Sequence, residues 1–152
     1  MFSIILLCLV TFFYAAYNLL IKQSSLHAQE LATTTVTATI ALQLAATITS
    51  VTFLLILRQS GVQQFLLPAP AYGWAIAAGV CIGAAEIAYF YVFTGVAGSW
   101  PVPVSLAVPV IVGGSVVLAT LAAWIVFGES LHIRHWVGSA LVVCGVALLA
   151  WR

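Results

Sequence analysis

One carboxylate, Glu86, lies deep inside a long apolar run, GVCIGAAEIAYFYVF (residues 79–93). An ionised side chain at the centre of a bilayer costs a few kcal/mol even on lenient insertion scales, so such a residue tends to be paired, protonated or functional. We therefore expect Glu86 to hold a proton or a cation and to release it when a substrate arrives. The alternative is a protonated structural carboxyl group that is hydrogen-bonded to a polar side chain of another helix.

Polar side chains in the apolar runs are candidates for the same site. Tyr89 follows Glu86 by about one helical turn. Tyr14 and Asn18 share a helix face in the first run, and Gln43 lies in the second. The two polar stripes comprise Thr11, Tyr14 and Asn18 in the first run and Thr39, Gln43, Thr47 and Ser50 in the second. Such faces are predicted to turn away from lipid. In the alternative, their hydroxyl groups simply bond to their own backbone.

Glycine and proline mark two places where helices could approach closely or bend. Gly79 and Gly83 form a GxxxG pair on the face of the carboxylate, which would let another backbone pack near it. Pro109 removes a backbone donor inside an apolar run and should kink or break that helix. We predict a hinge at Pro109, Gly113 and Gly114.

The remaining ionisable residues lie near the ends of the runs. Glu129 follows Gly128 at a helix junction and is predicted to cap the next helix or to pair with Arg134. His132 and His135 are three residues apart, but no third ligand lies nearby, so we expect no metal site. The chain has no Asp, and no Ser/His/carboxylate constellation can be assembled. We expect neither an enzyme nor a bound cofactor.

The composition predicts a protein that is embedded in lipid. Of 152 residues, 64% are apolar and 5% are charged, which is too little charge to cover the surface of a soluble domain. A formal net charge of +1 without a basic run gives no reason to expect nucleic acid as a partner. The three cysteines lie inside apolar runs at no metal or redox spacing.

Five stretches are long enough to cross about 30 Å of hydrocarbon, which takes about 20 helical residues. They cover approximately residues 2–21, 31–57, 71–96, 102–127 and 133–151. The connections between them are short and leave no room for a soluble domain. We therefore expect a single all-α integral membrane domain over residues 1–152, with five transmembrane helices.

The positive charges give no orientation signal. With the N-terminus inside, Arg58 and Arg134 would be cytoplasmic, while Lys22 and Arg152 would lie on the far side. Both sides then carry the same number of positive residues, so the positive-inside rule favours neither orientation. If the chain inserts both ways, two copies could pair antiparallel and form an inverted repeat of the kind that many transporters encode in one polypeptide. The alternative is one orientation, fixed by the N-terminal residues or by a partner.

Three segments carry a resemblance to a known family. They are AAEIAYFYVF (84–93), SWPVPVSLAVPVIVGG (99–114) and FGESLHIRHWVGSALVVCGVALLAW (127–151). Their order resembles that of the EamA-type domain of the drug/metabolite transporter superfamily, a five-helix unit of similar length. Most members carry two such units in an inverted repeat, so the resemblance implies half of a transporter, completed by a second copy or a paralogous subunit. The cavity residues that it implies are Tyr14, Asn18, Glu86, Tyr89 and Pro109.

These features together predict a multi-pass transporter of the cytoplasmic membrane. We expect it to move a small metabolite or drug-like solute by alternating access, as an antiparallel homodimer or with a paralogous membrane subunit. Its site would comprise Glu86, Tyr89, Tyr14, Asn18 and Gln43, and Glu86 could couple transport to protons. The alternative is a non-transporting membrane subunit or a lipid-handling accessory protein of a larger complex.

Overall fold

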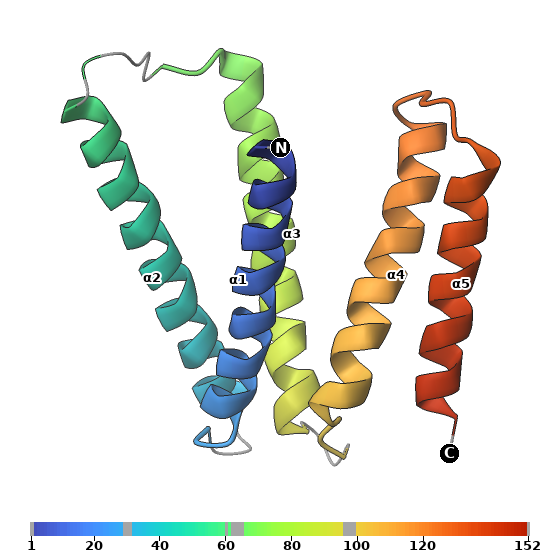
Figure 1. Cartoon of the computed structure of the whole chain (residues 1–152). Coiled ribbons are helices and arrows are strands. Elements are labelled where there is room, and N and C mark those ends of the chain that lie inside the picture. Colours follow the sequence, from blue (N-terminus) through green and yellow to red (C-terminus); the bar gives the residue numbers. More distant parts are fainter. Residues whose placement is uncertain (1, 29–31, 60, 62–65, 96–99, 152) are drawn as a thin grey trace. The chain divides into compact units, whose positions relative to one another are not determined.

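The structure is a computed structural model that describes residues 2–28, 32–59, 61, 66–95 and 100–151. Its regular structure in these ranges is entirely helical: α1 (Phe2–Ser25), α2 (Ala32–Gln59), α3 (Ala69–Thr94), α4 (Val104–Ile125) and α5 (Ile133–Ala150) (Figure 1). Each of these helices is long and apolar enough to cross a membrane. The predicted class, an all-α multi-pass membrane protein with five spans, is confirmed. The prediction of a single domain stays a prediction.

Several helices extend beyond the predicted spans. α1 runs to Ser25 rather than to residue 21, and α2 runs to Gln59 rather than to residue 57. A count of apolar residues stops near the first charge, whereas Lys and Gln are good helix formers and let a helix continue. Two predicted span ends, at residues 31 and 96, lie outside the described residues.

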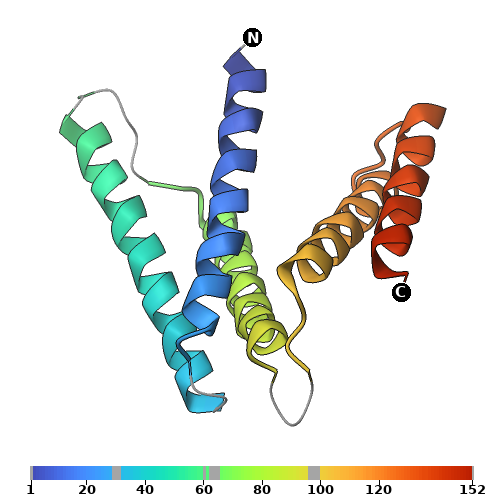
Figure 2. The same cartoon turned by 60° about the horizontal axis from the view of Figure 1, so that its bottom comes forward.

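The chain forms two compact units. The first combines residues 1–19 with residues 102–152, and the second contains residues 20–101. In the first unit α4 packs along α5, and Figures 1 and 2 show these two helices side by side and antiparallel. In the second unit α2 packs against α3.

The α4–α5 pair is close at a point where α4 lacks a side chain. A Cβ atom at Gly113 would lie 2.7 Å from Val146 Cγ2 and 3.2 Å from Val142 Cγ1. Further along the pair, Ser139 Oγ donates a hydrogen bond of 3.3 Å to Thr120 Oγ1. Small and polar residues thus join these two helices, as is typical of helix pairs in membranes.

Two tryptophans close one end of the same pair. The rings of Trp124, near the end of α4, and Trp136, near the start of α5, meet edge to face with centroids 5.7 Å apart. Trp151 lies at the other end of α5 and is exposed. Amphipathic indole rings favour the headgroup region of a bilayer, so these positions agree with the ends of membrane spans.

The core of the second unit lies at one end, where α1 and α3 finish and α2 begins. Its buried residues are Ile21, Ser25, Thr35, Thr39, Glu86, Tyr89, Phe90, Phe93 and Thr94. Phe90, Phe93 and Thr35 are the most completely buried side chains among them. Beyond this end, α2 and α3 mostly expose apolar side chains, as expected of surfaces that face lipid.

Candidate functional site

Glu86 is buried in α3, the helix whose two ends are set by local signals. Pro68 precedes the first turn, and Gly95 ends the helix in the left-handed conformation (φ 72°), with its N–H donating to the Tyr91 carbonyl. Proline before a first turn and glycine after a last turn are the usual helix boundaries. Glu86 lies about 7 Å from the midpoint of this helix at 1.5 Å per residue. It therefore sits well within the hydrocarbon region of a bilayer.

The surroundings of Glu86 on its own helix are aromatic. Its side chain is 6% exposed, and Tyr89, Phe90 and Phe93 on the following turns are also buried. The rings of Tyr89 and Phe93 are in contact, with centroids 4.7 Å apart. The structure thus places Glu86 and Tyr89 together in the buried end of the second unit.

Lys22 provides a cation at the same end of α3. Its ammonium group donates a hydrogen bond of 3.4 Å to the Phe93 carbonyl and lies 5.3 Å from the centroid of the Phe93 ring. A cation is favourable at a helix C-terminus, where carbonyl groups lack partners, and over an aromatic face. From the sequence, Lys22 was predicted only to be one of the charges that flank the spans. No local pattern could reveal this contact, because the two residues are 71 positions apart.

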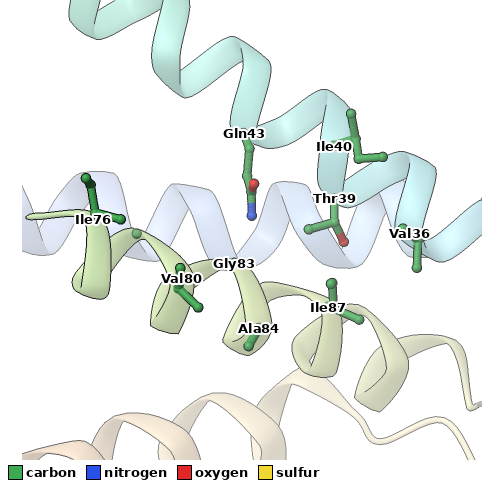
Figure 3. Close-up of a pocket in the computed structure, with 10 residues that line it drawn as sticks. Val36, Thr39, Ile40, Gln43, Ile76, Val80, Gly83, Ala84 and Ile87 are labelled. Atoms are coloured by element: carbon green, nitrogen blue, oxygen red, sulfur yellow. The ribbon is translucent and has the colours of Figure 1, made fainter.

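Gln43 lies on a groove between α2 and α3. Its side chain extends from α2 toward Gly83, where a Cβ atom would lie 3.1 Å from the amide nitrogen (Figure 3). The groove has a volume of about 510 Å³ and is lined by Val36, Thr39, Ile40, Gln43, Ile76, Gly79, Val80, Gly83, Ala84 and Ile87. Nothing lies within 4 Å of the Cβ position at Gly79. The expected close approach of another backbone at the GxxxG pair is therefore not observed among the described residues; Gly83 admits a side-chain amide instead.

Tyr14 and Asn18 belong to the first unit, whereas Glu86, Tyr89 and Gln43 belong to the second. Asn18 is 9% exposed and Tyr14 is 62% exposed. The exposed hydroxyl of Thr11 donates to a carbonyl of its own helix, that of Leu7, at 2.8 Å. Of the polar stripe on α1, Asn18 is buried in the chain, whereas Tyr14 and Thr11 are exposed, and the prediction that this face turns away from lipid stays a prediction.

The stripe on α2 divides in the same way. Thr39 is 2% exposed, whereas Thr47 and Ser50 are exposed and donate to the carbonyls of Gln43 and Ala46 in their own helix. Because these hydroxyl groups are already hydrogen-bonded, they can face lipid at little cost. For Thr47 and Ser50 the structure supports the alternative of bonding to the backbone.

The predicted hinge lies in an unbroken helix. α4 continues through Pro109, so the chain does not break there, and the hinge stays a prediction. Proline leaves the carbonyl of Ser105 without its usual helical donor. Gly113 packs against α5, while nothing lies within 4 Å of the Cβ position at Gly114.

Glu129 does not have the role that was predicted for it. α5 begins after His132, whose backbone N–H donates to His135 Nδ1 at 3.0 Å, while the His132 side chain accepts from the His135 backbone. This reciprocal pair replaces the expected cap because the N-cap residue, His132, lies three residues beyond Glu129. Within the part of the chain that the structure describes, Glu129 and Arg134 form no ion pair.

Named proteins with similar sequences are flippase subunits. A protein of Yersinia pseudotuberculosis serotype O:1b, named as a probable 4-amino-4-deoxy-L-arabinose-phosphoundecaprenol flippase subunit ArnE, is 40% identical over 50 residues. These residues are 33% of this chain and 43% of that protein. A protein of the same name from Yersinia pestis matches to the same extent. Another from Salmonella paratyphi B is 34% identical over 76 residues, which are 50% of this chain and 62% of the relative.

The matches cover less than two thirds of each of these relatives. The 50 matched residues are a larger share of the Yersinia relative than of this chain, so that relative is the shorter protein. No protein-family model and no solved structure matches the chain. The resemblance to the EamA-type domain therefore stays a prediction. The chain is similar to membrane flippase subunits, and its five apolar helices agree with a multi-pass membrane protein.

Proposed function

We propose that this chain is a subunit of a transporter that moves a lipid-linked polar group bearing an amine across the cytoplasmic membrane. The observation that carries the proposal is the burial of Glu86, 6% exposed, at a depth where a bilayer has no water. The similarity to flippase subunits, whose names specify a 4-amino sugar on phosphoundecaprenol, favours a lipid-linked substrate over the small free solute expected at first.

The chemistry of the site would be an exchange of cations on one carboxylate. A protonated amine and an ionised carboxylate attract each other more strongly at low dielectric than in water. When no substrate is present, a proton on Glu86 would remove the cost of placing a charge at this depth in the bilayer. Binding of the ammonium group would then displace that proton. Tyr89, Asn18, Tyr14 and Gln43 would shape the cavity and hold the hydroxyl groups of the sugar.

The transporter would contain two such chains. A single unit with five spans would be completed by an antiparallel copy of itself or by a paralogous subunit. The names of the similar proteins support this arrangement, since they describe subunits of a flippase. Alternating access would then be a rocking of the two subunits about the shared site, with Pro109 to Gly114 as the flexible segment.

The test is translocation by membranes that contain the full chain. A lipid-linked amino sugar is supplied on one side, and a membrane-impermeant amine reagent reports its arrival on the other. Glu86→Gln should lower the rate at least about tenfold, which corresponds to about 1.4 kcal/mol. The matched control is Glu129→Gln, an exposed carboxylate outside the spans, which should leave the rate unchanged. An unchanged rate for Glu86→Gln at every pH, at equal protein levels, would contradict the role of Glu86.

A second candidate is a membrane subunit that does not itself transport but stabilises a lipid-handling complex. The word "subunit" in the names of the relatives favours it as much as it favours transport. This candidate predicts a stable hetero-oligomer on purification and normal translocation by that complex when it carries Glu86→Gln.

A further inference from the structure

The groove between α2 and α3 has the dimensions of a channel for one hydrocarbon chain. Along α3 it runs from Ile76 to Ile87, which is about 17 Å at 1.5 Å per residue. A volume of about 510 Å³ over this length corresponds to a mean width of about 6 Å, which is enough for an extended lipid chain lying along the groove.

A cationic side chain, Lys22, lies beyond one end of the groove, where it can bind an anionic head group. No lining residue is charged. Lys22 contacts Phe93, about 9 Å along α3 beyond Ile87, whereas Arg58 lies about 22 Å along α2 beyond Gln43. The half-buried Lys22 ammonium uses one of its three donors on the Phe93 carbonyl. The remaining donors can bind a phosphate.

The groove also crosses the middle of the membrane. With the midpoint of α3 taken as the bilayer centre, the groove reaches about 8 Å to each side. Each leaflet contributes about 15 Å of hydrocarbon, so a chain anchored at one surface and confined to one leaflet ends near the centre. Only a longer chain can start at Lys22 and fill the groove to Ile76. Ile76 and Val80 are 67% and 69% exposed, so such a chain could enter from the lipid.

We infer that the α2–α3 groove binds the chain of a polyprenyl phosphate, with the phosphate on Lys22. This inference rests on the proposed function and deepens it, because it assigns the lipid part of the substrate to a site separate from the carboxylate. The amide of Gln43, at the centre of the groove, marks the point where the chain crosses from one leaflet to the other.

Two glycines of α3 provide a matched test. Gly79 lines the groove and Gly73 does not, yet neither has any atom within 4 Å of its Cβ position. Both positions therefore accept a Cβ atom without a clash inside the chain, and leucine at the two positions gives a matched pair of variants. Membranes containing the full chain are irradiated with a polyprenyl phosphate that carries a diazirine on its chain, and the labelled residues are located by mass spectrometry.

We expect label on the groove residues of the unchanged chain. Gly79→Leu should lower the yield about tenfold because the new side chain fills the groove, and Gly73→Leu should leave it within about twofold. Lys22→Gln should lower labelling by the phosphate about fivefold without affecting uncharged polyprenol, and Lys22→Arg should restore it. A photoactivatable phosphatidic acid with ordinary acyl chains should label the groove weakly.

Each failure has a separate meaning. No labelling of the unchanged chain by polyprenyl phosphate would overturn both the groove assignment and the proposed lipid-linked substrate. Labelling outside the groove, equal labelling of both leucine variants, or equal labelling by phosphatidic acid would overturn the groove assignment alone. Loss of subunit association in Gly79→Leu would show that the groove binds a protein helix and would overturn the assignment as well.

Discussion

Replacement of Gly113 by alanine tests the packing of α4 on α5 most sharply, because its neighbour Gly114 provides an internal control. A Cβ atom at Gly113 would lie 2.7 Å from Val146 Cγ2, closer than carbon atoms pack, whereas nothing lies within 4 Å at Gly114. The contacted group cannot easily rotate away, because valine in a helix is confined to essentially one rotamer. The two helices must therefore move apart or strain.

The magnitude follows from the difference between the two variants. Each Gly→Ala change gains up to about 1 kcal/mol from helix propensity and from the restricted unfolded chain. Overpacking costs typically about 1–3 kcal/mol and applies only to Gly113→Ala. The propensity gain cancels in the comparison, so we expect Gly113→Ala to be less stable than Gly114→Ala by about 1–3 kcal/mol.

The assay is reversible unfolding of the purified chain in mixed micelles, titrated with a denaturing detergent and followed by tryptophan fluorescence. Trp124 and Trp136 report directly on this helix pair, because their rings are in contact. Equal midpoints for the two alanine variants would refute the close α4–α5 packing at Gly113.

Four further results are expected. Ser139→Ala and Thr120→Ala should each lower the free energy of unfolding by about 0.6 kcal/mol or less in the same assay. A double-mutant cycle should show that the two effects are coupled, and strict additivity would contradict the hydrogen bond between the two side chains. His135→Ala should cost about 0.5–2 kcal/mol by removing the acceptor that caps α5, and unaltered stability would contradict the cap. Pro109→Ala should lower the rate of translocation without lowering the amount of folded protein. An unchanged rate would contradict the predicted hinge at Pro109. Paired reporters after Arg152 should give signal on both sides of the membrane for an antiparallel homodimer, while signal on one side would require a paralogous partner.

The helices were predictable because each is a long apolar run. α3 and α4, for example, contain 26 and 22 residues and show no charge except Glu86, so length and composition alone define them. Their ends were less predictable. The start of α5 depends on a reciprocal pair of histidines, His132 and His135, whereas an acidic cap at Glu129 was predicted. The spacing of three residues is visible in the sequence, but two metal ligands can have the same spacing.

The candidate site was predictable only in part. The burial of Glu86 followed from its position in an apolar run, since a carboxylate at that depth cannot easily snorkel to the membrane surface. The Lys22–Phe93 contact and the placement of Gln43 on Gly83 join helices that are far apart in the sequence, so no periodicity could specify them. The spacing of the polar stripes does not distinguish exposed from buried members of a stripe. Tyr14 and Thr47 are exposed in the chain, and a hydroxyl bonded to its own helix has the same spacing as a buried one.

The central claim is that Glu86 exchanges a proton for the amine of a lipid-linked substrate. The most direct measurement is the release of protons when a polyprenyl-phosphate amino sugar is added to the purified chain in weakly buffered micelles. We expect release by the unchanged chain, none by Glu86→Gln, and none with a substrate analogue whose amine is replaced by hydroxyl. The claim would be contradicted if the unchanged chain and Glu86→Gln both bind the amino sugar and release equal numbers of protons. It would also be contradicted if both bind the amino sugar and neither releases protons.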